Sequence, residues 1–359
     1  MRDFVRRIVV SISLVLALTV VLTQSAPAQT FNVIHTFTGK GDGATPWSGL
    51  TMDQAGNLYG TTCGNDCGYG GNAGSIFRLS RNGSSWIFNP LYNFPGGSAG
   101  GNPYAGVVLG PHGSLYGTTP YAFGGYGTVF SLTPSATACK SAICYWAETL
   151  LYRFTGGSDG AAPAFGDVIF DGAGNLYGTT LFGGAYSAGT VFELTPSGSG
   201  WTENILYSFT GGSDGGYPYA GLIFDQAGAL YGATMFGGQA GGGTVFKLTP
   251  VNGIWNYSTV YSFNGPGGAY CGPAGNLIMD AAANLYGATQ CDGTYGLGSV
   301  FELTLSGGRW TYTSLHDFAN GSDGGNPVGP VMLDASGNLY GTASRSGSSG
   351  QGVVFEITP

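Results

Sequence analysis

Short apolar runs separated by Gly-rich segments recur along the chain, and residues 222–263 show the pattern most clearly. An apolar run at 222–225 precedes a four-residue turn and a second apolar run at 230–234. After a Gly-rich loop, residues 244–248 alternate between apolar and polar side chains, and residues 255–263 form a further run rich in aromatic and β-branched residues. Short runs of this kind bounded by Gly, Pro and Asn are typical of β-strands. The pattern therefore predicts four short antiparallel strands, denoted A, B, C and D.

This four-strand unit is repeated six times, and the sequence Gly-Asn-Leu-Tyr-Gly-Thr-Thr or a variant of it marks strand B of each copy. The leucines of the motif are separated by 57, 61, 54, 55 and 54 residues, at Leu58, Leu115, Leu176, Leu230, Leu285 and Leu339. A regular period of this length indicates one supersecondary unit whose core forms when neighbouring units pack. Four strands in a unit of ~55 residues predict an all-β fold, a six-bladed β-propeller of four-stranded antiparallel blades.

The sixth copy stops after strand C, and its strand D is missing from that end of the chain. Residues 29–37 (QTFNVIHTF) align without gaps with residues 201–209 (WTENILYSF), the strand D of the third copy. We expect this N-terminal strand to close the last blade, because the pairing removes the free strand edges. An open stack of repeats is the alternative, and it would leave the N-terminal strand without a partner.

Residues 1–28 have the features of a secretory signal peptide. Three Arg precede an apolar run at residues 8–22, and Ala26-Pro27-Ala28 is a small-x-small cleavage site. A membrane anchor is the alternative, but the run is shorter than the ~20 apolar residues that span a bilayer. The predicted organisation is thus a signal peptide at 1–28 and a single β-propeller domain of six repeats at 29–359.

Composition and charge narrow the range of partners. Only 8% of the residues are charged, while 68 are Gly without a three-residue period and 14% are aromatic, which excludes collagen and simple disorder. The leader contains three Arg and one Asp, so its removal changes the net charge from −8 to −10. This acidity argues against nucleic acid and anionic membranes as partners. We expect a monomer with an extracellular glycan or protein ligand and no membrane insertion after cleavage.

The repeated unit G-x-x-x-D-x-x-G-N-L-Y-G-T-T…G-G-x-x-x-G-T-V-F-x-L-T-P resembles the GloVer tandem repeat of exported bacterial proteins, the choice-of-anchor family. The resemblance covers about residues 31–359. It implies a secreted or surface location, often with a C-terminal sorting anchor. Here the chain ends inside a repeat with no anchor after it, so we expect a released, extracellular protein. The resemblance implies no activity.

Six Cys in an exported chain indicate disulfide bonds. Cys63 and Cys67 share one loop, Cys139 and Cys144 share another, and Cys271 and Cys291 lie in two loops of one repeat. Zinc binding at the first pair is the alternative, although no second pair of ligands has matching spacing. We favour disulfides and leave their connectivity open.

In an A-B-C-D meander, the B–C loops and the D–A crossovers lie on one face of the propeller. The crossovers carry Asp in Gly-Ser-Asp-Gly-like sequences and a variable residue, often aromatic, after a Pro. Aromatic rings stack on sugar faces and carboxylates accept hydroxyl hydrogens, so this face suits a carbohydrate. The predicted ligand-binding residues are Trp47, Tyr104, Tyr219, Asp42, Asp159, Asp214 and Asp323. The alternative is that each Asp caps its own turn and the rings wedge between blades.

A second set of Asp residues ends strand A, at Asp53, Asp171, Asp225, Asp280 and Asp334. Asp and Asn before a hairpin are ordinary turn residues. Calcium could bind there, but no copy has the dense alternating oxygen ligands of a calcium loop. We expect these residues to form turns and the protein to need no cofactor.

Catalytic motifs are not found in the sequence. It has only three His and no Ser-His-Asp, His-Glu-x-x-His or phosphate-binding motif. Asp159 and Asp214 are the best available carboxylate pair for a glycosidase. The sequence therefore predicts a secreted non-enzymatic repeat protein that binds a glycan or another extracellular ligand. A structural or protein-interaction propeller at the cell surface is the alternative, and a polysaccharide lyase or hydrolase is a third reading.

Overall fold

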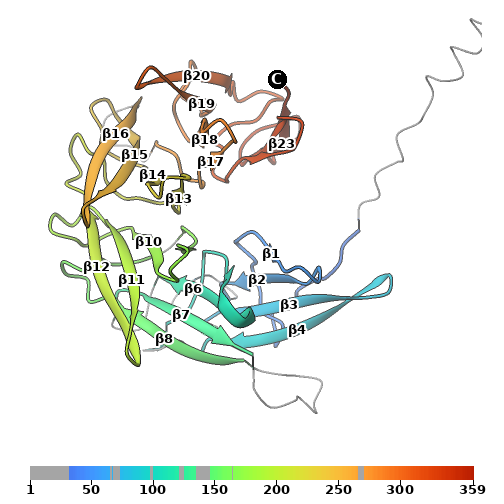
Figure 1. The fold of residues 1–359 in the computed structure, drawn as a ribbon. Coiled ribbons are helices and arrows are strands. Elements are labelled where there is room, and N and C mark those ends of the chain that lie inside the picture. The colour runs from blue at the N-terminus through green and yellow to red at the C-terminus, as the bar shows by residue number, and fades with distance from the viewer. Residues whose placement is uncertain are drawn as a thin grey trace, which may run out of the picture. The chain divides into compact units, whose positions relative to one another are not determined.

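Six antiparallel sheets follow one another along the chain and form a ring, a six-bladed β-propeller (Figure 1). This is a computed structural model, and it describes residues 32–359 except 65–66, 68–72, 98–99, 121–124, 135–145, 164 and 266–270. Five sheets have four strands in the order A-B-C-D, and the sixth has three. The propeller unit begins at Phe37. A 3-10 turn, η2, spans Pro111–Gly113. The predicted fold class is confirmed.

Strands A and B are the short inner strands of each blade, and the blades are numbered 1 to 6 in chain order. The A strands are β1 Thr51–Met52, β5 Val108–Leu109, β9 Ile169–Phe170, β13 Ile223–Phe224, β17 Ile278–Met279 and β21 Met332–Leu333. The B strands are β2 Leu58–Thr62, β6 Leu115–Thr119, β10 Leu176–Thr180, β14 Leu230–Thr234, β18 Leu285–Thr289 and β22 Leu339–Ala343.

Strands C and D are longer and form the outer hairpin of each blade. The C strands are β3 Ser75–Asn82, β7 Thr128–Thr133, β11 Thr190–Ser197, β15 Gly241–Val251, β19 Ser299–Ser306 and β23 Val353–Ile357. The D strands are β4 Ser85–Asn93, β8 Ala147–Arg153, β12 Gly200–Ser208, β16 Ile254–Asn264 and β20 Arg309–Asp317. Figure 1 shows A strands such as β13 and β17 toward the centre of the ring and D strands at its rim.

The Gly of the strand B motif is required by a Phe on strand C. In blade 3, Gly178 pairs with Phe192, and a Cβ on Gly178 would lie 2.6 Å from the Phe192 ring. That distance is shorter than a carbon–carbon contact allows, so the fully buried ring lies directly across the Gly. The other blades repeat this pair as Gly60–Phe77, Gly117–Phe130, Gly232–Phe246, Gly287–Phe301 and Gly341–Phe355.

The two Thr positions of the motif serve two different contacts. Thr179 donates its hydroxyl hydrogen to the backbone carbonyl of Ala220 in the next blade, at 3.1 Å. The hydroxyl of Thr180 lies 2.8 Å from that of Thr190 on the neighbouring strand C. All three Thr side chains are buried, where a hydroxyl needs a partner. The first Thr therefore links blades, and the second links strands within a blade.

The turn between strands A and B is organised by the Asp that ends strand A. In blade 3, Oδ1 of Asp171 accepts the backbone N–H groups of Ala173 and Asn175, both at 2.9 Å, and Oδ2 accepts the Tyr177 hydroxyl at 3.1 Å. Partial burial alone would raise the pKa of Asp171, but these donors lower it overall. The turn interpretation of this Asp set is therefore confirmed.

Packing between blades uses a Phe at the end of strand D, or just after it, against the strand C Phe of the next blade. The ring centroids of Phe209 and Phe246 are 5.1 Å apart in an edge-to-face arrangement. Four other pairs lie 4.9 to 5.4 Å apart, namely Phe94–Phe130, Phe154–Phe192, Phe263–Phe301 and Phe318–Phe355. Edge-to-face rings at this spacing add to the free energy of apolar burial. Five separate core clusters lie along these seams.

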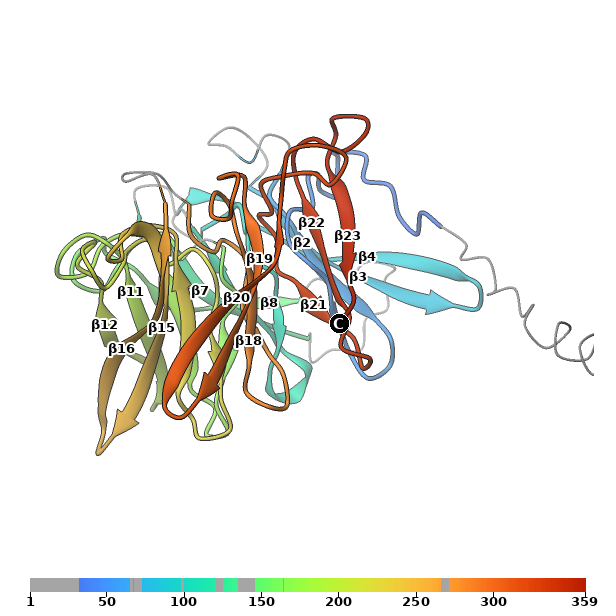
Figure 2. The ribbon, with the colours of Figure 1, turned by 90° about the horizontal axis from the view of Figure 1, so that it is seen from above.

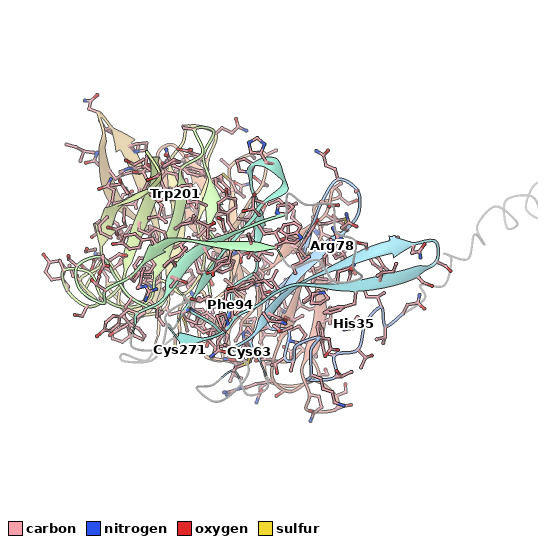
Figure 3. The ribbon with its side chains drawn as sticks, turned by 90° about the horizontal axis from the view of Figure 1, so that it is seen from below. His35, Cys63, Arg78, Phe94, Trp201 and Cys271 are labelled. Carbon is pink, nitrogen blue, oxygen red and sulfur yellow. A yellow bond between two sulfur atoms is a disulfide. The ribbon has the colours of Figure 1, made fainter. Side chains whose placement is uncertain are left out.

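The loop-rich face is built as the meander predicts. Isolated bridges join the D–A crossover to the B–C loop in three blades, at Ala161–Phe182, Gly216–Phe236 and Gly325–Arg345. Figure 2, an edge-on view, shows the β15–β16 hairpin projecting on the opposite side. Figure 3 shows Cys63 and Cys271 toward one face of the molecule and Trp201, at the start of strand D, toward the other.

The expected closure of the last blade by residues 29–37 is not seen. The sheet of blade 6 contains β21, β22 and β23, and residues 32–37 carry no strand assignment. Residues 29–31 lie outside the described part of the chain. The closure stays a prediction.

Candidate functional site

The inner ends of the A strands meet around the centre of the propeller, on the face of the D–A crossovers. The residue two positions before the first residue of each A strand defines a ring of six equivalent positions. In order from blade 1 to blade 6 it holds Gly49, Gly106, Asp167, Gly221, Asn276 and Pro330. Gly166 and Gly275, one residue earlier, also lie against the next blade, at Gly221 and Gly329 respectively. Asp167 is the one ionisable side chain in this ring of positions.

Two side chains of the ring are held by backbone groups of the preceding blade. Oδ1 of Asp167 accepts the N–H of Gly106 at 2.7 Å, and Oδ1 of Asn276 accepts the N–H of Gly221 at 2.7 Å. A Cβ on either Gly would lie 3.1 Å from the oxygen that it binds. Gly at these two positions therefore allows the side chains to approach closely.

The environment of Asp167 favours its neutral form. Burial raises the pKa of this carboxyl above its ordinary value, and the hydrogen bond from Gly106 opposes the shift only in part. A carboxyl whose pKa is raised above its ordinary value is a stronger proton acceptor when it is ionised, and it keeps its proton to higher pH. Asp167 is thus the best-placed acid–base group at the centre of the propeller.

An arc of aromatic rings lies beside this ring of positions. The centroids of Phe165 and Tyr219 are 3.8 Å apart with nearly parallel planes, and Tyr104 stacks on Phe165 at 5.2 Å. Trp47 meets Tyr104 edge to face at 5.9 Å, and Trp47 is 59% exposed. Blades 1 to 4 therefore contribute one ring each. Blades 5 and 6 place the smaller Ala274 and Val328 at the corresponding position.

Three of the predicted ligand-binding residues, Trp47, Tyr104 and Tyr219, are thus brought together, with Phe165 between them. Phe165 was missed because blade 3 has one extra residue after its Pro, which made Ala164 the apparent equivalent. Asp167 was missed as well. Its signal was present in the sequence, since other blades carry Gly, Asn or Pro at that position.

The four predicted Asp residues are held in their own crossover turns and bind within them. Oδ2 of Asp159 accepts the Thr155 N–H at 2.7 Å, and Oδ1 accepts the Thr155 hydroxyl at 2.7 Å. Asp42 and Asp323 accept backbone N–H groups of their turns in the same way, and Asp214 accepts both the N–H and the hydroxyl of Thr210. The structure provides turn caps at these four sites. Whether they also bind a ligand stays a prediction.

Two carboxyls lie between blades, at a position of strand D that holds Phe88 in blade 1 and Tyr257 and Tyr312 in blades 4 and 5. Glu148 accepts the Tyr92 hydroxyl at 2.9 Å. Glu203 faces Tyr152 and Asp159 of the preceding blade, and its Oε1 is buried without a hydrogen bond. Burial, with a smaller contribution from the Asp159 charge, raises the pKa of Glu203 from 4.5 to about 7. The sequence analysis did not single out either Glu.

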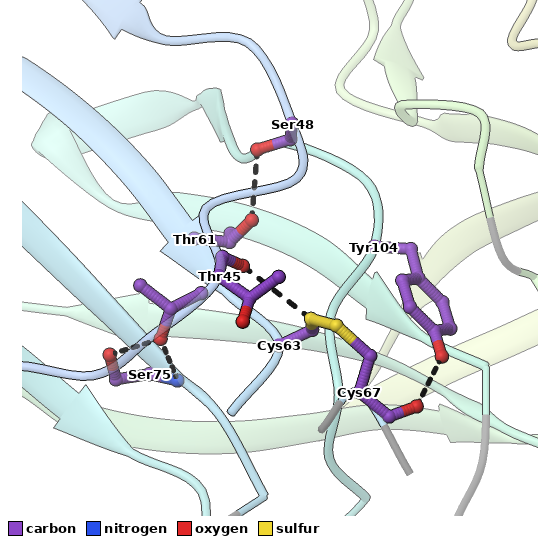
Figure 4. The surroundings of a disulfide bond; sticks show 8 residues. Thr45, Ser48, Thr61, Cys63, Cys67, Ser75 and Tyr104 are labelled. Carbon is purple, nitrogen blue, oxygen red and sulfur yellow. Dashed lines mark hydrogen bonds between the residues drawn. A yellow bond between two sulfur atoms is a disulfide. The ribbon is translucent and has the colours of Figure 1, made fainter. Parts of the chain in front are cut away.

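Two of the three expected cysteine pairs are disulfides. Cys63 bonds to Cys67 within one loop, and Figure 4 shows the Tyr104 hydroxyl donating to the carbonyl of Cys67, at 2.6 Å. Cys271 bonds to Cys291 and joins a crossover to a B–C loop, where other blades use a backbone bridge. Cys139 and Cys144 lie outside the described residues.

Two surface pockets lie away from the ring of A-strand ends. One, of about 400 Å³, is on the loop-rich face between blades 2 and 3 and includes Tyr126 and Phe182. The other, of about 500 Å³, is near the A–B turns of blades 3 and 4 and includes Tyr177 and Trp255.

In the described residues no group of three or more His, Cys, Asp or Glu is arranged to hold a metal ion. No helix of the described ranges has the length and apolarity to cross a membrane.

The repeat is matched by a family model along nearly the whole chain. The model of the Gloeobacter/Verrucomicrobia repeat matches residues 19–172, 123–272 and 165–359. The chain belongs to this repeat family. The resemblance to the GloVer repeat is therefore confirmed, and the family accounts for the sixfold Leu-Tyr-Gly-Thr-Thr motif. A comparison with curated proteins found no match.

Solved structures share the propeller architecture at low sequence identity. A "putative 6-phosphogluconolactonase" from Bacteroides fragilis has a TM-score of 0.56 and 13% identity, over 87% of this chain and 84% of that chain. A similarly described protein from Bacteroides uniformis has a TM-score of 0.53 and 15% identity, over 87% and 85%. The periplasmic gluconolactonase of Pseudomonas aeruginosa has a TM-score of 0.53 and 16% identity, over 87% and 85%. Likeness at this identity establishes a shared fold.

These structures correct the expected function. We expected a non-enzymatic binding module for a glycan or another extracellular ligand, with a structural propeller as the alternative, because the chain lacks linear catalytic motifs. Propellers named for lactone hydrolysis have the same architecture. In such a fold the functional groups come from several blades, so the lack of a linear motif is no argument against catalysis.

Proposed function

We propose that this protein is a hydrolase of a sugar lactone, or of a similar cyclic ester, and that Asp167 is its acid–base residue. The observation that carries the proposal is the position of the Asp167 carboxyl, at the inner end of strand A, with a pKa raised by burial. The lactonase propellers with the same architecture support the reaction class. The fold alone does not select a substrate.

The proposed reaction needs one group that moves a proton. The Asp167 carboxylate takes a proton from water as the water oxygen attacks the lactone carbonyl carbon. The tetrahedral intermediate then collapses, the bond between this carbon and the ring oxygen breaks, and Asp167 returns the proton to the leaving oxygen. The product is the open hydroxy acid. General acid–base catalysis of this kind contributes ~10²–10⁴-fold to a rate.

Asn276 is the proposed donor to the developing oxyanion. Its Oδ1 is committed to the Gly221 N–H, which directs the Nδ2 amide group away from that backbone. A fixed donor of this kind stabilises negative charge that develops in the transition state. The aromatic arc formed by Trp47, Tyr104, Phe165 and Tyr219 offers apolar surface to the face of a sugar ring.

Charge favours a neutral lactone over a phosphorylated one. The chain has a net charge of −8, and the ring of A-strand ends carries Asp167 and no Lys or Arg. A phosphate-bearing substrate would be repelled, because none of the six described ring positions holds a cation to pair with it. We therefore propose an uncharged aldonolactone.

The test is a pH-stat assay of the full chain with glucono-1,5-lactone, with its 6-phosphate run in parallel and the spontaneous rate subtracted. We expect the wild-type protein to accelerate hydrolysis of the neutral lactone and Asp167→Asn to lower kcat by at least ~10²-fold. Asp171→Asn is the matched control, since it changes the same kind of side chain at the other end of strand β9 and should keep its activity. No acceleration with either lactone would refute the proposal.

We also propose that residues 1–28 are removed during export. The apolar run, the small-residue cleavage site and the two disulfides support this location, because disulfides persist in oxidising compartments. Intact-mass measurement of the protein recovered from an exporting host should give a chain that starts at Gln29. An uncleaved chain that stays in the cytoplasm would contradict the proposal.

A further inference from the structure

The pocket between blades 3 and 4, near their A–B turns, has aromatic walls. Four rings line this space of about 500 Å³, those of Phe170, Tyr177, Phe224 and Trp255. The Tyr177 centroid lies 5.2 Å from that of Phe224 and 6.0 Å from that of Trp255, with interplanar angles of 86° and 63°. Rings inclined so steeply form separate walls instead of one stack. Phe224 and Trp255 are each only partly buried, so a ligand can reach their surfaces.

Carboxylates add negative charge to these aromatic walls. Asp171 and Asp225, which follow strands β9 and β13, also line the pocket. Partial burial alone would raise the pKa of both carboxyls, but their hydrogen-bond donors lower it overall, so both are ionised at neutral pH. A third carboxyl, that of Glu193, accepts the Tyr177 hydroxyl at 2.6 Å. Aromatic faces and carboxylates together attract a cation.

Blade 4 shows the same cluster with a cation in place. Its Tyr231 pairs across strands with Lys247, as Tyr177 of blade 3 pairs with Glu193. The Lys247 ammonium lies 4.9 Å from the centroid of the Tyr231 ring and 3.3 Å from Oδ2 of Asp225. The chain itself thus places a cation over the Tyr ring and beside the Asp of strand A. Blade 3 keeps the Tyr and the Asp but has an acid where blade 4 has the ammonium.

We infer that the pocket between blades 3 and 4 binds an organic cation that carries a trimethylammonium group. The oxygens of Asp171 accept two backbone N–H groups, the Asn175 amide and the Tyr177 hydroxyl, at 2.8 to 3.1 Å. A carboxylate has about four lone-pair positions, so Asp171 has none left for an N–H donor of a ligand. A trimethylammonium group donates no hydrogen bond, and its methyl groups pack on ring faces that attract its charge.

This inference does not depend on the proposed activity, because the A–B turns lie on the face opposite the D–A crossovers. The first test is isothermal titration calorimetry of the full chain with choline and with its uncharged carbon analogue, 3,3-dimethyl-1-butanol. The two ligands have the same shape and differ in charge. We expect choline to bind at least ~10-fold more tightly than the alcohol. Equal affinities, or no binding of choline, would overturn the inference.

A charge variant places the cation site in the pocket. Glu193→Lys should put an ammonium over Tyr177, as Lys247 does over Tyr231, and so should weaken choline binding at least ~10-fold. Glu302→Lys is the matched control, because Glu302 has the same position in blade 5, and it should keep the wild-type affinity. Unchanged choline binding by Glu193→Lys would show that the cation binds elsewhere.

A second pair of variants tests the aromatic wall. Trp255→Leu should weaken choline binding about 10-fold, since it removes a ring face. Trp310→Leu is the control, because Trp310 has the same place beside strand C in blade 5. Equal affinities of the two variants would contradict the assignment. The Glu193→Lys comparison covers the case in which Trp255→Leu fails to fold.

Vesicles of phosphatidylcholine distinguish the two sources of a trimethylammonium group. Co-sedimentation of the full chain with these vesicles, lost in Glu193→Lys, would assign the group to a lipid headgroup. Choline binding without co-sedimentation would assign it to a free small molecule. Either result supports a trimethylammonium site between blades 3 and 4.

Discussion

Oδ1 of Asp167 accepts a 2.7 Å hydrogen bond from the backbone N–H of Gly106 in the neighbouring blade. The bond fixes one carboxylate oxygen against the inner edge of blade 2, while burial raises the pKa of the group. The same arrangement recurs two blades further on, between Asn276 and Gly221. An acid and an amide are thus held by equivalent contacts around the centre of the propeller, and the acid–base chemistry that we propose for this site depends on the first.

The raised pKa of Asp167 predicts the acid limb of the activity profile. Only the carboxylate can take a proton from water, so kcat/KM should rise with pH through the pKa of Asp167. Because burial raises this pKa, the midpoint of the limb should lie above 3.8, the value of an ordinary Asp. Initial rates measured between pH 4 and pH 7 would locate it. A limb centred at or below the ordinary value would exclude Asp167 as the base.

The aromatic arc predicts an effect on substrate affinity. Tyr219→Ala removes the ring that stacks on Phe165 at 3.8 Å. If a sugar ring packs on the arc, KM should rise several-fold while kcat changes less. The reason is that stacking of a sugar on an aromatic ring stabilises the bound substrate and the transition state to a similar extent. Tyr219→Phe is the control, because it keeps the ring. An unchanged KM for Tyr219→Ala would place the substrate away from the arc.

The close approach of Gly232 and Phe246 predicts a steric effect. A Cβ at residue 232 would lie 2.5 Å from the Phe246 ring, so Gly232→Ala should destabilise the protein by ~1–3 kcal/mol through overpacking. Combining Gly232→Ala with Phe246→Leu should cost less than the sum of the two single changes, because the smaller side chain leaves room. Urea unfolding of the four proteins in this cycle measures the coupling. Additive effects would contradict the steric explanation.

Glu203 predicts that stability falls as pH rises toward neutrality. Its pKa is about 7 in the folded protein and 4.5 in an ordinary Glu, so the folded state binds the proton more tightly. The stabilisation by the neutral acid is complete below pH 4.5 and is lost as pH rises through about 7. The groups that face it are Asp159 and Tyr152. Glu203→Gln stays neutral, so its unfolding midpoint should change less than that of the wild type between pH 5 and pH 8.

The crossover Asp residues predict a turn-cap effect. Asp214 accepts the Thr210 N–H at 2.8 Å and the Tyr207 hydroxyl at 3.0 Å. Asp214→Ala should therefore lower the free energy of unfolding by about 1–3 kcal/mol, because buried donors lose their acceptor. Asp214→Asn keeps an acceptor oxygen and should cost less. Thermal unfolding separates the two variants, and equal losses would show that the carboxylate charge matters more than the cap.

The sixfold motif made most of the fold predictable. The Gly of Leu-Tyr-Gly-Thr-Thr meets a strand C Phe in all six blades, and the Tyr and Thr contacts recur in several of them, so the spacing of the motif was sufficient to place the strands. The two faces of the meander also followed from strand order. Closure by residues 29–37 could be expected from alignment alone, but the strand pairing itself stays a prediction.

The candidate site was only partly predictable. Trp47, Tyr104 and Tyr219 could be selected from their position after a Pro, but the sequence did not show that Phe165 completes their stack. The four crossover Asp residues were predicted to bind a ligand, and in the structure each accepts a backbone N–H of its own turn, while ligand binding stays a prediction. Asp167 was missed, although an alignment of the repeats shows it as the one acid at a position that holds Gly, Asn or Pro in the other blades.

The sequence by itself determined the number of blades and the strand order, because these depend on contacts at short and regular separations along the chain. The tertiary structure alone decided which side chains meet at the centre of the ring. Asp167 and Gly106 are 61 residues apart, and Asn276 and Gly221 are 55 apart. Such positions come together only because successive blades are arranged around one ring. The burial that results from this arrangement raises the pKa of Asp167.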